Sequence, residues 1–215
     1  MNSLSRPLQW LVWGILIAVI AGISIAFILS ERHRQPPLPV YGQIPDFTLT
    51  NQFGQPVRLA DLKGSVWVAD IIFTACAGPC PRMTQFMSQL QEALPEGPVK
   101  LVTLTTDPDN DSTAVLKRYG DRYGARPERW QFLTGAKSEI RRLAADGLKL
   151  AAVEKKPEER ENESDLFIHS TIFVVVDQQG RLRGSFETVG ENVDPQKARQ
   201  DILDAVNRLI RNRGR

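Results

Sequence analysis

Residues 66–81 read VWVADIIFTACAGPCP, the segment from which the architecture of the chain can first be predicted. Its first eight residues are almost all apolar, which is typical of a strand buried on both faces. Residues 82–94 then space apolar side chains, two methionines among them, as one face of a helix does. We interpret those methionines as core residues, because their spacing matches the apolar face. The sequence therefore predicts a strand, a short turn that carries Cys76 and Cys80, and a helix.

Strands and helices alternate on either side of this unit. Further strands are predicted at residues 47–49, 56–59, 99–105, 130–133, 170–176 and 181–186. Further helices are predicted at residues 112–123 and 137–145 and from Asp194-Pro195 onward. Residues 154–165 are highly charged and predict a mobile loop. The fold class is therefore α/β, with a central mixed sheet flanked by helices.

An apolar segment precedes the α/β region. Residues 8–29 contain no charged side chain in 22 positions, long enough for a helix at about 1.5 Å per residue to cross a core of roughly 30 Å. Trp10 and Trp13 lie near its first end, where indole rings favour the headgroup zone. A cleaved signal peptide usually has a shorter apolar region, so we favour an uncleaved transmembrane anchor. Lys and Arg counts, one before the span and two after it, weakly favour a cytoplasmic domain.

The predicted organisation has three parts: an anchor at residues 1–30, a linker at 31–45 and the α/β domain at 46–215. Pro36, Pro37 and Pro39 stiffen the linker into a spacer. His33 lies in it between two arginines and is interpreted as a solvated residue.

Composition narrows the class of protein. The net charge is +2, with 27 basic and 25 acidic side chains, so nothing indicates nucleic acid as a partner. Two cysteines close almost no loop and do not make a disulfide scaffold. With only two histidines, His33 and His169, each one is informative.

The spacing Cys76-x-x-x-Cys80 indicates either redox or metal chemistry. A helix N-terminus favours thiolates, the form that attacks disulfides and binds soft metals. Positions i and i+4 of a helix hold Cβ atoms about 5–6 Å apart, whereas a relaxed disulfide needs roughly 3.8 Å. The pair can close with local adjustment, or its sulfurs can bind one Cu(I) ion. Zinc normally takes four ligands and is the weaker alternative. Spacing alone leaves redox and copper about equal.

From residue 44 to about residue 210, the chain resembles the Sco/SenC family of copper-binding cytochrome c oxidase assembly proteins. Five segments carry the resemblance in order: PDFTL at 45–49 with DLKG at 61–64, FTAC at 73–76 through CP at 80–81, TTDP at 105–108 through Asp111 with VLKRY at 115–119, FLTG at 132–135, and HST at 169–171 continuing to residue 177.

This resemblance implies a thioredoxin-like fold and copper ligands at Cys76, Cys80 and His169. It implies a supporting role for Asp107 and a domain on the periplasmic side of the membrane. It also implies a copper-accepting oxidase subunit, or another periplasmic copper or thiol protein, as the partner. The family commonly has proline after the first cysteine, where this chain has Ala77.

Three hypotheses follow. The first is a metallochaperone that delivers copper to a respiratory oxidase. The second is a thiol–disulfide oxidoreductase in which Cys76 attacks and Cys80 resolves the mixed disulfide. The third and weakest is a thiol peroxidase, for which Arg82 is the local arginine. His169 separates the first two, since copper binding needs it and disulfide exchange does not.

Overall fold

The computed structural model describes residues 6–32, 36–150 and 171–211. The chain divides into two compact units, Met1–Pro37 and Leu38–Arg215. The first unit contains the 27-residue helix α1, Arg6–Arg32.

The side chains described in α1 are exposed and mostly apolar, Trp10 among them. Within the described residues, no helix combines the length and the apolarity that crossing a membrane requires. The predicted span also includes residues 8 and 26–29, whose side chains are not among those that the structure describes. The anchor therefore stays a prediction.

The second unit is built on a mixed sheet. Its described strands follow the order β1-β8-β7-β4-β5-β6-β2-β3. They are β1 Gly42–Gln43, β2 Thr48–Asn51, β3 Pro56–Arg58, β4 Val66–Ile72, β5 Val99–Thr105, β6 Trp130–Thr134, β7 Ile172–Val176 and β8 Arg181–Glu187. The three adjacent strands β4, β5 and β6 run parallel, and every other pair is antiparallel.

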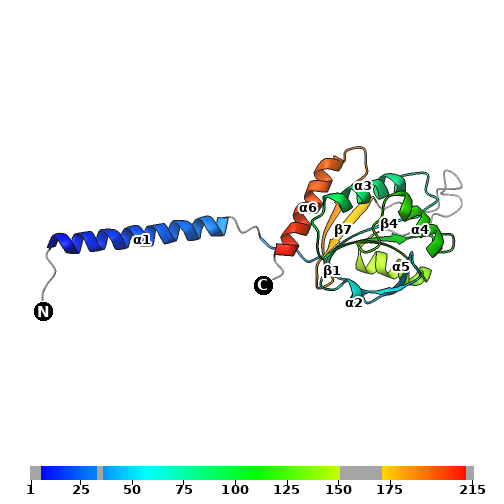
Figure 1. Cartoon of the computed structure of the whole chain (residues 1–215), viewed down its shortest axis with the longest axis horizontal. Helices are drawn as coiled ribbons and strands as arrows, with labels where there is room; N and C mark the ends of the chain where they lie inside the picture. Colours follow the sequence, from blue (N-terminus) through cyan, green and yellow to red (C-terminus); the bar gives the residue numbers. More distant parts are fainter. Residues whose placement is uncertain (1–5, 33–35, 151–170, 212–215) are drawn as a thin grey trace. The chain divides into compact units, whose positions relative to one another are not determined.

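Helices cover both faces of this sheet (Figure 1). They are α2 Leu59–Leu62, α3 Cys80–Ala93, α4 Thr113–Arg122, α5 Lys137–Arg142 with the π-helical turn η1 Leu143–Gly147, and α6 Pro195–Arg211. Alternate residues of β4 enter two separate apolar clusters. Val68 packs with α3, α4 and α6, whereas Trp67 packs with α2, α5 and η1. The predicted α/β class, with a central mixed sheet flanked by helices, is therefore confirmed.

Most predicted elements are present, with shifted ends. The helix predicted at 82–94 begins earlier, at Cys80. Pro79 and Pro81 suit the first turn of a helix, because backbone N–H groups there have no carbonyl partner within the helix and proline therefore loses no hydrogen bond. Asp194 accepts bonds from the first backbone N–H groups of α6, as its cap role predicts. The helix predicted at 137–145 widens instead into η1. The predicted loop at 154–165 lies outside the described residues.

Part of the predicted linker packs onto the domain. Strand β1 pairs with β8, where Gly42 lies opposite Leu182. Ile44 is buried in the cluster on the α2 face. Residues 42–44 therefore do not act as a free spacer, because they complete the edge of the sheet.

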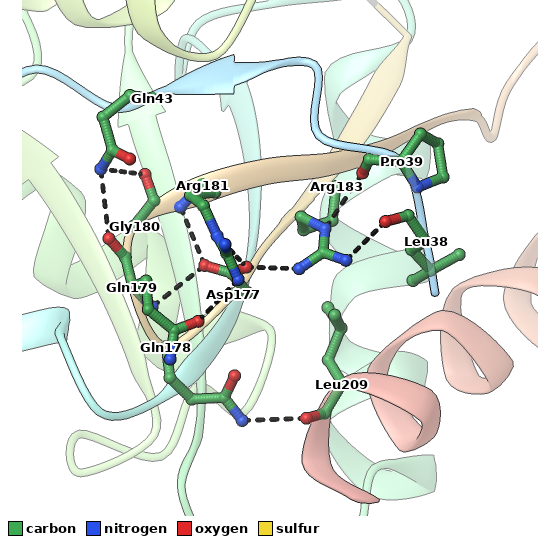
Figure 2. A network of polar contacts seen from close by, with 10 residues as sticks. All are labelled: Leu38, Pro39, Gln43, Asp177, Gln178, Gln179, Gly180, Arg181, Arg183 and Leu209. Carbon is green, nitrogen blue, oxygen red and sulfur yellow. Dashed lines mark hydrogen bonds and ion pairs between the residues drawn. The ribbon is translucent and has the colours of Figure 1, made fainter. Parts of the chain in front are cut away.

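A buried ionic network holds the residues that directly precede β1 in the chain (Figure 2). Asp177 accepts hydrogen bonds from the Arg181 side chain at 2.8 Å and from Arg183 at 2.6 Å. Arg183 also donates to the carbonyls of Pro39, at 3.0 Å, and Leu38, at 2.5 Å. Burial raises the pKa of Asp177, but hydrogen bonds from Arg181 and Arg183 lower it by more, so the pKa lies below its ordinary value. The charged pair therefore ties the start of the domain to β8.

Candidate metal and redox site

The cysteines lie where β4 ends. All seven residues of β4 are buried, and the chain then turns through residues 73–79 into α3. The backbone N–H of Cys76 donates to the Phe73 carbonyl at 3.3 Å and closes the first part of this turn. Because β5 runs parallel to β4, the loop after β5 meets the same edge of the sheet.

No disulfide joins the two cysteines, and both are buried, with 6% of Cys76 and 2% of Cys80 exposed. The Gly78 backbone N–H donates to the Cys76 sulfur at 3.3 Å. A hydrogen bond to Cys76 and then burial raise the pKa of the Cys80 thiol. This direction is opposite to the lowering that a helix N-terminus alone predicts, because the neighbouring sulfur and burial both disfavour the charged form of Cys80. The two sulfurs are therefore close neighbours at the start of α3.

The methionines of α3 belong to the core. Met83 and Met87 are 1% and 0% exposed and pack within the apolar cluster on this face of the sheet. Their interpretation as core residues is confirmed. Arg82, the arginine considered for a peroxidase, is exposed on the same helix and lines a surface groove beside Phe86.

A carboxylate from the loop after β5 contacts the turn. Asp111 accepts the Thr74 backbone N–H at 3.1 Å and the Thr74 hydroxyl at 2.5 Å. The Thr105 hydroxyl donates to it at 2.5 Å. Burial raises the pKa of Asp111, and the hydrogen bonds from Thr105 and Thr74 partly offset that rise. Sequence reasoning selected Asp107, but the described partner of the Asp107 carboxylate is Asn110, at 2.9 Å.

A second carboxylate lies inside the sheet. Asp70 of β4 is fully buried and accepts a 2.6 Å hydrogen bond from the Thr103 hydroxyl. Trp130 donates in turn to Thr103 at 2.9 Å. Among the described residues, the Asp70 Oδ2 atom has no hydrogen-bond partner. Burial raises the pKa of Asp70 to about 7. Sequence reasoning missed this group, although a charged residue within an apolar strand was the available signal.

His169, the third predicted ligand, lies outside the described residues, as does His33. No group of three or more His, Cys, Asp or Glu side chains in the described chain could hold a metal ion. The structure thus brings together two of the three predicted ligands, Cys76 and Cys80.

The comparisons with known proteins identify the family. The model of the SCO1/SenC family matches residues 40–207. The chain belongs to the SCO1/SenC family. The SCO1 protein homolog of Bacillus subtilis is 35% identical over 188 residues, which cover 86% of this chain and 94% of that protein. A Stutzerimonas stutzeri relative, named for copper binding, is 31% identical over 78% of this chain and 80% of its own length.

Solved structures show the same fold. BsSco, described as a Sco-family cytochrome c oxidase assembly protein with a disulfide switch, matches with a TM-score of 0.66. It is 34% identical, and the match covers 81% of this chain and 99% of BsSco. The thioredoxin-like fold implied by the Sco/SenC resemblance is therefore confirmed.

Proposed function

We propose that this Sco/SenC protein binds copper through Cys76, Cys80 and His169 and delivers it to the copper centre of a respiratory oxidase. The observation that carries the proposal is the pair of neighbouring cysteines, not joined by a disulfide, in the turn and helix that follow β4. Thiolates select soft Cu(I), and an imidazole would complete a three-coordinate site. A relative named for copper binding supports the choice of metal.

The strand register supports His169 as the third ligand. Strand β7 is antiparallel to β4, and Val174 lies opposite Ala69. The first residue of β7, Ile172, therefore lies toward the edge at which β4 ends. His169 precedes Ile172 by three residues in the chain, and the cysteine turn begins at this same edge.

We further propose that α1 anchors the protein, with the domain on the periplasmic side. The uncharged run at residues 8–29 supports the anchor, and the Sco/SenC resemblance supports the side. Alkaline extraction of membranes should leave the full chain in the pellet, and protease added outside should digest its domain. Release by alkali would contradict the anchor, and protection from protease would contradict the periplasmic side.

The second candidate function is disulfide reduction in a partner, favoured by the closeness of two cysteines that no disulfide joins in this structure. The Cys76 thiolate would attack the partner disulfide and release one partner thiolate. Cys80 would then lose its proton and attack the Cys76 sulfur, which releases the second partner thiolate. Two electrons pass to the partner, and the pair is left as a Cys76–Cys80 disulfide.

Anaerobic Cu(I) competition on the reduced full-length chain in mild detergent tests the leading function. The variants are Cys76→Ser and His169→Ala, with His33→Ala as the matched histidine control. We expect one Cu(I) per chain, with affinity reduced roughly 100-fold in Cys76→Ser and at least tenfold in His169→Ala. His33→Ala should bind as the parent does. Weak parent binding, equal in both histidine variants, would exclude copper delivery and leave the oxidoreductase.

A further inference from the structure

The Asp111 carboxylate connects the cysteine turn to the next strand. It lies in the loop between β5 and α4 and is 1% exposed. Both of its oxygens accept hydrogen bonds from Thr74, from the backbone N–H and from the hydroxyl. One of them also accepts the Thr105 hydroxyl at the end of β5. A single buried side chain thus holds the ends of two adjacent parallel strands.

Thr74 lies where it can set the path of the backbone into Cys76. It is the second residue of the turn that begins at Phe73 and closes with the Cys76 N–H. Its backbone N–H and its hydroxyl are both used by the same carboxylate, so neither the peptide plane nor the side chain is free to rotate. The Cys76 side chain starts two residues further along the chain.

The other side of the contact is firmly held. The Asp111 backbone N–H donates to the Asp107 carbonyl at 2.8 Å, and Ser112 caps α4 by accepting the Val115 N–H. Asp107 in turn donates its own N–H to the Thr105 hydroxyl at 2.9 Å. The carboxylate therefore lies between the end of a central strand and the start of a helix, and it can act as a fixed point.

We propose that Asp111 is the positioning residue of the Cys76–Cys80 pair, because it fixes Thr74 and thereby the backbone that carries Cys76. Its effect on copper affinity rests on the proposed function, whereas its effect on the dithiol does not. A chain segment that is already ordered loses less freedom when its sulfurs close on one metal ion or on each other. Without this contact, both events require the turn to be ordered first.

The first experiment compares variants of the full-length chain in anaerobic Cu(I) competition. Asp111→Ala removes the acceptor, Asp111→Asn keeps part of it, and Thr74→Val removes only the hydroxyl. Asp109→Ala is the matched control, because Asp109 is exposed in the same loop. We expect Asp111→Ala to weaken binding at least about tenfold and Asp111→Asn to weaken it less, with Asp109→Ala within about twofold of the parent.

A double-mutant cycle separates positioning from general damage to the fold. If Asp111 acts through Thr74, adding Thr74→Val to Asp111→Ala should weaken Cu(I) binding by no more than about another twofold. The proposal would be overturned if the losses in Cu(I) affinity of the two single variants multiplied in the double variant. It would also be overturned if Asp111→Ala bound Cu(I) as tightly as Asp109→Ala does.

The second measurement is independent of copper. The fraction of Cys76–Cys80 disulfide is determined in glutathione buffers, where a looser turn lowers the effective concentration of one thiol near the other. We expect Asp111→Ala to lower the equilibrium constant for disulfide formation at least about fivefold, with no change in Asp109→Ala. If the parent binds no copper, the proposed function fails and this measurement still decides the role of Asp111. An unchanged constant would then overturn it.

Discussion

Asp70 gives the domain a stability that depends on pH. Its carboxyl group is fully buried in β4, and only Oδ1 has a described partner, the Thr103 hydroxyl. Burial raises the pKa from 3.8 to about 7. Between these two values the folded protein keeps a proton that the unfolded chain has released. The contribution of Asp70 to stability therefore falls as pH rises from about 4 to about 7.

The size of this effect follows from the pKa shift. A rise of about three units, at 1.36 kcal/mol per unit, makes the charged form of Asp70 cost about 4 kcal/mol in the folded state. Asparagine has nearly the same shape and does not titrate. The difference in unfolding free energy, Asp70→Asn minus parent, should therefore increase by about 4 kcal/mol between pH 4 and pH 8. Any constant cost of the new amide cancels from that increase.

Urea unfolding at closely spaced pH values, followed by tryptophan fluorescence under reducing conditions, measures this difference. Asp109→Asn is the control, because that side chain is exposed. Its difference from the parent should not change with pH. If the Asp70→Asn difference varies by less than about 1 kcal/mol from pH 4 to pH 8, the assignment of a buried, titrating carboxyl is refuted.

Two further predictions concern a buried ion pair and a tight core contact, and both can be measured by urea unfolding at pH 7. Arg183→Ala leaves Asp177 buried with fewer partners and should cost about 3 kcal/mol, whereas Arg181→Ala, with a more exposed side chain, should cost about 1 kcal/mol or less. Equal losses would contradict a buried role for Arg183. Gly120→Ala places a Cβ 2.9 Å from the Phe132 ring and should cost about 1–2 kcal/mol despite the better helix propensity of alanine. A stabilised variant would show that the ring moves aside.

Local patterns predicted the fold because most of its elements have a clear period. The apolar run at 66–73 became β4, and the strands predicted at 47–49 and 56–59 became the β2–β3 pair. Strand β1 was missed, since Gly42–Gln43 has neither an apolar run nor alternation and exists only because β8 offers it an edge. The widening into η1 is likewise a matter of packing, which helical spacing alone does not encode.

Some residues of the candidate site could likewise be predicted from their neighbours in the sequence, and others could not. Cys76 and Cys80 could be predicted because four residues separate them and the strand and helix around them are regular. Asp111 reaches Thr74 across 37 residues, so no local pattern distinguishes it from Asp107. What separates the two aspartates is the parallel register of β4 and β5, which brings the loop after one strand against the turn after the other. A motif can therefore name the atoms that react, but the contacts that order them depend on the assembled sheet.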